Sequence, residues 1–182
     1  NRFHPVCLIG RCARRMETLA RQRWGGTFHA GMAAALATCI AAWFGCAALF
    51  LPFSLLPSPW APWIPSVLVI YICMAPRSLA EHARKVENAL RSGNAGEARH
   101  SVSMIVGRDT ERMDVYGIAR AAIESVAENL TDGVFSTLFW ASAGCLAGGA
   151  SGAASAALAH RVFNILDAMW GKKNDRYKHF GT

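Results

Sequence analysis

Residues 106–134 read VGRDTERMDVYGIARAAIESVAENLTDGV, and this stretch carries nine charged side chains in 29 positions. A helix over about Val115–Asn129 places Arg120, Glu124 and Glu128 at i, i+4 and i+8, on one face. Two carboxylates stacked in this way repel each other, and the repulsion costs more beside a membrane than in water. The pattern therefore predicts either a solvated face or a site that holds a metal ion or a substrate.

The composition around this stretch is that of a membrane protein. Of the 182 residues, 53% are apolar and 17% are charged, against roughly 25% charged in an ordinary soluble domain. Residues 24–76 and 133–160 contain no Asp, Glu, Lys or Arg. The net charge of +7 is compatible with nucleic acid, but the basic residues border apolar segments, which favours a membrane surface and no nucleic acid. No C-x-x-C pair occurs among the six cysteines, so neither a disulfide framework nor a zinc site is predicted.

The N-terminal residues 1–26 are basic, with six arginines against the single acid Glu17. Apolar residues recur there at helical spacing, so we expect an amphipathic interfacial helix on an anionic leaflet. The chain starts without an initiator Met or a signal-peptide pattern, so we expect it to begin inside a longer or processed sequence.

Residues 29–76 predict a membrane hairpin. His29–Leu51 is long enough to cross a hydrocarbon core of ~30 Å. Five prolines and two tryptophans then break the helix and mark an interfacial loop, and Ile64–Ala75 forms a second, shorter apolar run. Both flanks carry arginine and the tip carries none, so the positive-inside rule places residues 1–26 and the region after Arg77 in the cytoplasm.

Residues 77–133 form a cytoplasmic region with two further predicted helices, Arg77–Arg99 and about Ala95–Ile105. Ser78 and Glu81 match a capping box for the first, and Ser92-Gly93-Asn94 ends it. Asp109 or Thr110 is the expected N-cap of the helix that follows. His82 and His100 are interpreted as surface or capping histidines rather than as ligands.

Residues 134–160 are a membrane or re-entrant segment rich in Gly, Ala and Ser. A single span here would place the basic tail, residues 161–182, on the outside, against the positive-inside rule. Gly148-Gly149 and Gly152 offer a break. We therefore expect a broken helical hairpin that returns to the cytoplasmic side, so that residues 161–182 form a cytoplasmic tail.

Polar groups gather at both ends of this hairpin, which would bring them together. The groups are Glu124, Glu128, Asn129 and Asp132 before it, and Asn164 and Asp167 after it. Carboxylates with water are how Mg²⁺ is normally held, and nearby Arg and Lys side chains suit phosphate. Each residue alone is explained by capping, ion pairing or packing, but the whole group beside membrane segments favours function. Phosphate-loop, dinucleotide, zinc-protease and serine-elbow motifs are absent from the sequence.

Several motifs resemble one known family. In order they are HPVCLIG, RSLAEHA, VGRDT, AAIESVAEN-x-x-DGV, LFW and N-x-LDAM-x-G-x-K-x-x-RY-x-x-FG. They resemble the adenosylcobinamide-phosphate synthase family, also called CobD or CbiB, over nearly the whole chain. The resemblance implies an all-α, multi-pass membrane protein with cytoplasmic-side helices, located in the inner membrane and active in cobalamin biosynthesis.

The resemblance also implies an activity, an ATP-dependent amide ligation. Aminopropanol, or aminopropanol phosphate, is joined to a propionate of the corrinoid adenosylcobyric acid through an acyl phosphate made with Mg²⁺ and ATP. The expected partners are these substrates and the lipid membrane. Other enzymes of the pathway are further candidate partners.

Site residues follow from the motif positions. The expected catalytic residues are Glu124, Glu128, Asp132 and Asp167, with Glu124 or Glu128 as general base for the amine. Glu128, Asp132 and Asp167 are the expected Mg²⁺ ligands. The expected substrate and phosphate contacts are Arg108, Asp109, Thr110, Asn129, Asn164, Lys173 and Arg176.

Departures from the family pattern are few. Thr137 stands where members usually have proline, and Ile165 where threonine is usual. Members usually have further apolar segments before and after this region, so we expect an internal fragment truncated at both ends. One other interpretation stays open, a non-catalytic membrane regulator like the AmpE proteins. A piece of a small transporter would predict charges within the membrane spans, and residues 24–76 contain none.

Overall fold

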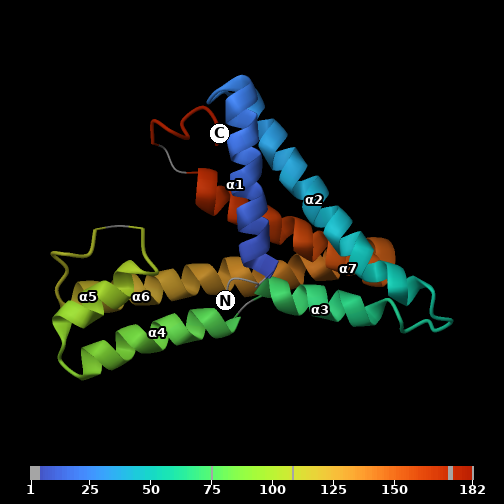
Figure 1. Cartoon of the computed structure of the whole chain (residues 1–182). Coiled ribbons are helices and arrows are strands. Elements are labelled where there is room, and N and C mark those ends of the chain that lie inside the picture. Colours follow the sequence, from blue (N-terminus) through green and yellow to red (C-terminus); the bar gives the residue numbers. More distant parts are fainter. Residues whose placement is uncertain (1–4, 75, 108, 172–173, 182) are drawn as a thin grey trace. The chain divides into compact units, whose positions relative to one another are not determined.

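The computed structural model describes residues 5–74, 76–107, 109–171 and 174–181. Every regular element in this part of the chain is a helix, which confirms the all-α prediction (Figure 1). The order is α1 (Pro5–Trp24), α2 (Phe28–Ser54), α3 (Trp63–Met74), α4 (Pro76–Arg91), α5 (Ala95–Ser103), α6 (Val115–Leu130), the π-helix η1 (Thr131–Phe135) and α7 (Ser136–Trp170). The chain forms two compact units: unit 1 comprises Asn1–Cys73 and Thr137–Thr182, and unit 2 comprises Met74–Ser136.

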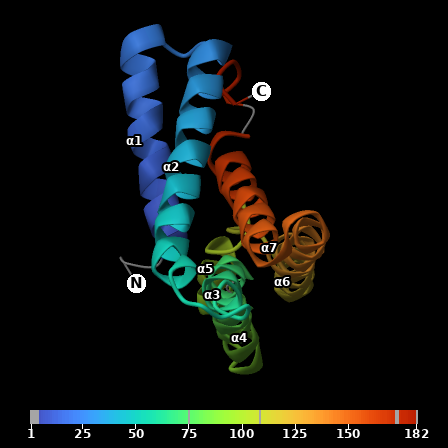
Figure 2. The same cartoon turned by 90° about the vertical axis from the view of Figure 1, so that its right-hand side faces the viewer.

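In unit 1, α1 and α2 lie side by side as a helical hairpin (Figure 2). Gly25, with φ of 69°, makes the turn, and the Thr27 hydroxyl accepts a hydrogen bond from the Ala30 backbone N–H at 3.3 Å to cap α2. Buried alanines, Ala13 on α1 and Ala34 on α2 among them, let the two backbones approach closely. That α1 lies on a membrane surface stays a prediction.

Helix α2 continues through Pro52, where the sequence predicted a break, and ends two residues later at Ser54. The proline ring disturbs only the final turn at that position, so the helix tolerates it. Within the described residues, three helical stretches are long and apolar enough to cross a membrane: Phe28–Ser54, Trp63–Arg91 and Val115–Trp170.

Helix α7 breaks at Gly148 and Gly149, whose backbone angles are not helical. The ribbon turns sharply there, and its two halves form a hairpin (Figure 1). The backbones of Gly144 and Gly152 are so close that a Cβ on either would collide with the other's carbonyl oxygen. The predicted break is therefore confirmed, whereas the side of the membrane on which the hairpin ends stays a prediction.

Unit 2 packs α4, α5 and α6 around a small apolar core that includes Val86, Val102 and Ile118. Gly93, with φ of 71°, lies directly after α4, and the Asn94 side chain accepts a hydrogen bond from the Glu97 N–H at 3.1 Å to begin α5. The predicted extents of α5 and α6 agree with the structure to within two residues.

Two predicted caps are wrong. Helix α4 begins at Pro76, so Ser78 lies inside its first turn instead of capping it. Helix α6 is capped by Asp114, which accepts a hydrogen bond from the Gly117 N–H at 2.7 Å, not by Asp109 or Thr110. Those two residues are engaged elsewhere, because the Asp109 carboxylate bonds the Glu111 N–H in a local turn and the Thr110 hydroxyl donates to the Arg99 carbonyl.

Candidate functional site

The predicted site residues divide between the two units. Unit 2 holds Asp109, Thr110, Glu124, Glu128, Asn129 and Asp132, and unit 1 holds Asn164, Asp167 and Arg176. Arg108 and Lys173 lie outside the described residues.

The loop before α6 is tied to α5. Thr110 is buried and donates its hydroxyl to the Arg99 carbonyl at 3.3 Å. The Arg99 Nε donates to the Met113 carbonyl at 2.9 Å, which holds the far end of the loop. A depression of about 510 Å³ lies beside these bonds and is lined by Arg99, His100, Ser103, Asp109, Thr110 and Glu111. The two bonds therefore fix the loop to α5, and the Asp109 side chain on this loop is exposed.

Helix α6 is fastened to the same loop through its buried Ser125, whose hydroxyl donates to the Ile105 carbonyl at 2.7 Å. The Asn129 side-chain nitrogen donates to the Ser125 carbonyl at 2.8 Å, so part of that side chain has a structural role. Glu124 and Glu128 are exposed. Exposed carboxylates are expected on a solvated face and on a ligand-binding face alike, so both interpretations made from the sequence stay open.

Asp132 lies in the π-helix between α6 and α7. The Ser136 N–H bonds the Thr131 carbonyl five residues earlier, which defines the wider turn. Such single π turns inside helices are frequent at functional sites, because they displace one residue from the regular spiral. No spacing in the sequence predicted this element, and Asp132 is its second residue.

In unit 1, Asn164 and Asp167 follow each other at i and i+3 near the end of α7. Gly171 lies directly against Asp167: its N–H donates to the Asp167 carbonyl at 2.7 Å, and a Cβ there would collide with the Asp167 carboxylate. Glycine at this position therefore leaves the exposed carboxylate in place at the helix end.

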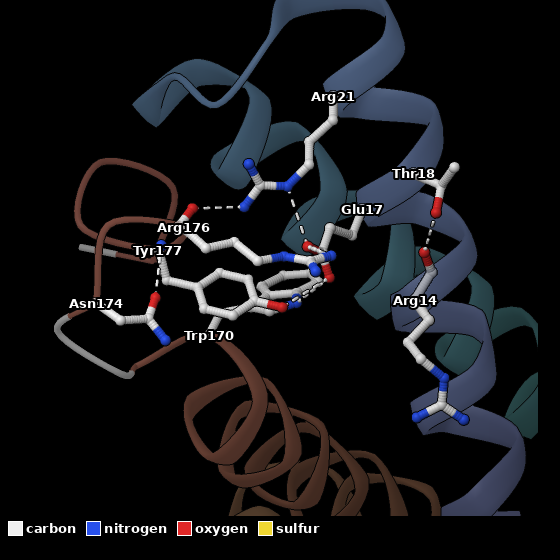
Figure 3. A network of polar contacts seen from close by, with 8 residues as sticks. All are labelled: Arg14, Glu17, Thr18, Arg21, Trp170, Asn174, Arg176 and Tyr177. Atoms are coloured by element: carbon white, nitrogen blue, oxygen red, sulfur yellow. Dashed lines mark hydrogen bonds and ion pairs between the residues drawn. The ribbon is translucent and has the colours of Figure 1, made fainter.

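The best-formed polar cluster in the described residues surrounds Glu17 on α1 (Figure 3). The Arg21 Nε and the Arg176 Nη2 each donate to Glu17 Oε1 at 3.0 Å. The indole Nε1–H of Trp170 donates to Glu17 Oε2 at 3.1 Å, and the Tyr177 hydroxyl donates to the same oxygen at 3.4 Å. Glu17 itself is only 3% exposed. One buried carboxylate thus joins α1, the end of α7 and the tail.

The electrostatics of this cluster favour the charged carboxylate. Burial alone raises the pKa of Glu17, but the hydrogen bonds from Arg176 and Arg21 outweigh burial, and the pKa lies below its usual value. The Arg21 guanidinium also lies 4.3 Å from the centre of the Phe180 ring. Two guanidinium groups face one carboxylate, so one positive charge is left over, and the Arg176 side chain is 65% exposed.

Aromatic packing and glycines complete the attachment of the tail. The Trp170 and Phe180 rings meet edge to face at 5.2 Å. Gly31 and Gly181 lie against the backbones of Phe180 and Trp170, where a Cβ would not fit. Sequence reasoning missed Glu17 as a site residue, although its place as the only acid among the arginines of residues 1–26 was a signal.

Magnesium was expected at Glu128, Asp132 and Asp167. Their oxygen ligands suit a hard cation in kind. Within the described part of the chain, no three His, Cys, Asp or Glu side chains lie close enough to hold a metal ion by themselves. Mg²⁺ is often bound by one or two carboxylates together with substrate phosphates, so a magnesium ion held in that way by these residues stays a prediction.

Comparison with known proteins identifies the family. The family described as "CobD/Cbib protein" matches residues 1–182. The chain is 41% identical over 185 residues to the "Cobalamin biosynthesis protein CobD" of Chromobacterium violaceum, covering 99% of this chain and 55% of the relative. The proteins of that name from Stutzerimonas stutzeri and Clostridium perfringens are 40% and 33% identical, with 99% and 100% of this chain and 55% of each relative covered.

The chain therefore spans about half the length of the curated relatives it matches. No solved structure matches it. The family match extends over all 182 residues and includes every motif residue discussed above. On this evidence the chain belongs to the CobD/CbiB protein family.

Proposed function

We propose that this chain acts in cobalamin biosynthesis as part of an ATP-dependent ligase. The ligase joins aminopropanol, or its phosphate, to adenosylcobyric acid through an amide bond. The observation that carries the proposal is the family match over residues 1–182, among whose members are proteins named for cobalamin biosynthesis. The clustered carboxylates and cations of the two units agree with the chemistry.

The proposed reaction has two steps. A carboxylate oxygen of the acid substrate attacks the γ-phosphorus of ATP, which forms an acyl phosphate and releases ADP. The amine nitrogen then attacks the acyl carbon, the C–O bond to phosphate breaks, and inorganic phosphate leaves. The amine loses one proton in this step, so a general base is needed.

Carboxylates of α6 are the proposed bases. Glu124 and Glu128 are exposed on a helix that Ser125 holds to the preceding loop, so their backbone is fixed while their carboxylates can reach a substrate. One of the two accepts the amine proton. Replacement by glutamine keeps the shape and removes the basicity, so Glu124→Gln or Glu128→Gln should lower turnover by roughly 10²- to 10⁴-fold. Full turnover in both variants would contradict this role.

Phosphate groups are proposed to meet Arg108, Lys173 and Arg176. Arg176 is oriented by Glu17 and still largely exposed, which suits a guanidinium that must bind a second anion. Glu128, Asp132 and Asp167 would hold Mg²⁺ together with ATP oxygens, and the metal would neutralise charge on the phosphates. Asp109, Thr110, Asn129 and Asn164 are proposed as neighbouring substrate contacts.

The protein is proposed to lie in the inner membrane with these motif residues on the cytoplasmic side, where ATP is available. Three stretches of membrane-spanning length and the arginine-rich flanks of the first hairpin support this arrangement.

The test is conversion of adenosylcobyric acid by membranes that contain the protein. The chain would be assayed alone and extended to the length of its relatives, with aminopropanol phosphate, and with Mg-ATP present or omitted. We expect a product heavier by the amine less water, formed only with Mg-ATP. No product from an inserted, folded protein of relative length would contradict the ligase and favour the regulatory alternative.

A further inference from the structure

A groove within unit 1 has no role in the function proposed above. It holds about 380 Å³, within the range of small-molecule sites, and is formed by α1, α2, α3 and the second half of α7. Its walls are mostly apolar, and Arg161 is the one charged side chain among the lining residues that the structure describes.

Arg161 is poorly satisfied in this groove. Its Nε is buried and has no hydrogen-bond partner among the described residues. The Thr38 hydroxyl in the same wall donates to the Ala34 carbonyl at 2.8 Å, and no hydrogen bond joins it to the Arg161 Nε. A buried donor without an acceptor is unfavourable, the more so when it is charged, and such groups call for a specific explanation.

An anion suits the buried guanidinium best, because it supplies an acceptor and balances the positive charge. A guanidinium presents paired N–H donors that match the two oxygens of a carboxylate. The apolar walls exclude additional charges, so the ligand should carry one anionic group on an otherwise uncharged body. The groove is too small for a large molecule and suits a short side arm.

We propose that this groove receives the carboxylate-bearing side arm of the acid substrate, with Arg161 pairing with its carboxylate. This proposal rests on the function proposed above, since that reaction needs an acid whose carboxylate is held and activated. Asn164 follows Arg161 one turn later on α7, and Asp167 one further turn, so the arginine of the groove and these two predicted site residues belong to the same helix.

The test compares two ligands that differ only at the arm. The protein, at the length of its relatives and in nanodiscs of zwitterionic lipid, would be titrated without ATP with adenosylcobyric acid and with its primary amide. We expect the acid to bind at least about tenfold more tightly, and Arg161→Gln to abolish that preference while changing amide binding less than threefold. Arg14→Gln, which removes an exposed arginine of α1, is the matched control and should change neither.

Stability gives a second, independent readout. Because the Arg161 Nε is unpaired without ligand, Arg161→Gln should not lower the unfolding midpoint of the ligand-free protein. The acid should raise that midpoint in wild type and not in the variant. A variant that is less stable than wild type without ligand would overturn the claim that the Arg161 guanidinium is unpaired in the ligand-free protein.

Other outcomes also decide the proposal. Equal binding of acid and amide by wild type, or equal loss of both in Arg161→Gln, would overturn it. Retention of an anionic phospholipid that depends on Arg161, and that the acid does not displace, would assign the groove to lipid instead. The titration contains no ATP and therefore measures binding apart from turnover. Acid selectivity in it, together with no conversion in the separate Mg-ATP assay, would contradict the ligase and leave the carboxylate site standing.

Discussion

Glu17 shows at the scale of one residue how the tail of this chain is held. It is a buried carboxylate whose hydrogen-bond donors come from its own helix and from residues more than 150 positions away. Its bond with Arg21 is the ordinary i, i+4 pair of a helix, whereas the contacts with Trp170, Arg176 and Tyr177 create the attachment. Sequence spacing indicates the pair within α1, but it does not indicate the contacts with the tail, because only the fold brings the tail to α1.

Removing the charge of Glu17 should loosen the tail. In Glu17→Gln the charge-assisted bonds to Arg21 and Arg176 are lost, a cost of about 2–3 kcal/mol. The amides of Lys178 and Gly181, which bond Asn174 and Tyr177 carbonyls at 2.8 Å, should then exchange with solvent roughly 30- to 100-fold faster. Hydrogen-exchange mass spectrometry would measure this.

The control is Thr18→Ala, one residue further on the same helix. The Thr18 hydroxyl donates to the Arg14 carbonyl within α1 and is exposed (Figure 3). Tail exchange should not change in this variant. Unchanged exchange in Glu17→Gln would mean that aromatic packing alone holds the tail.

Acid should release the same attachment. The folded-state pKa of Glu17 is depressed, so its stabilisation is present above the unfolded value of about 4.3 and is lost as pH falls through the folded pKa. The indole N–H resonance of Trp170, which bonds this carboxylate, should titrate with a midpoint below 4.3. The resonance should not titrate in Glu17→Gln, and a midpoint above 4.3 in wild type would mean that burial outweighs the two arginines.

At the scale of elements, the helices were predictable and some of their ends were not. Long apolar runs predict where helices form, and Gly93 and Gly148-Gly149 predict where helices end or break. The structure confirms these predictions. The N-cap of α6 was mispredicted because Asp109, Thr110 and Asp114 are all good capping residues. Which one caps depends on the turn made by Asp109 and on the bond from Thr110 to α5, neither of which spacing reveals.

The hairpin inside α7 depends on glycine at its closest approach. Gly144→Ala would press a Cβ into the Gly152 backbone, and neither backbone can move away without opening the hairpin. We expect a loss of about 1–3 kcal/mol in the free energy of unfolding, measured by denaturant titration in detergent. Gly45→Ala on α2, where a Cβ meets nothing within 4 Å, should remain within about 1 kcal/mol of wild type. Equal effects of the two changes would contradict the close packing.

At the scale of the whole molecule, the expected function draws on both compact units. The loop and carboxylates of residues 106–132 belong to unit 2, and Asn164, Asp167 and Arg176 belong to unit 1. The sequence predicted a hairpin between these two groups that would bring them together. The break in α7 confirms the hairpin, whereas the proximity of the groups stays a prediction. That the two groups act in one reaction is a proposal, and measurements of turnover test it.

The proposed topology makes a direct prediction for labelling. In a variant without its native cysteines, Ser58→Cys lies between α2 and α3, Glu97→Cys in α5, and Asp175→Cys in the tail, and all three positions are exposed. A membrane-impermeant thiol reagent on intact cells should label Ser58→Cys, and the other two only after lysis. Labelling of Asp175→Cys on intact cells would show that the hairpin of α7 does not return to the cytoplasmic side.

The most direct test of the central claim is the turnover of Asp167→Asn beside Glu128→Gln, measured as Mg-ATP-dependent amide formation by protein of the relatives' length. The two carboxylates come from different units, and both are proposed to act in one reaction. We predict that each change lowers kcat by at least about 100-fold, while the exposed neighbours Asp175→Asn and Glu97→Gln remain near wild type. Full turnover in either Asp167→Asn or Glu128→Gln would show that the site does not use both units, and would contradict the account.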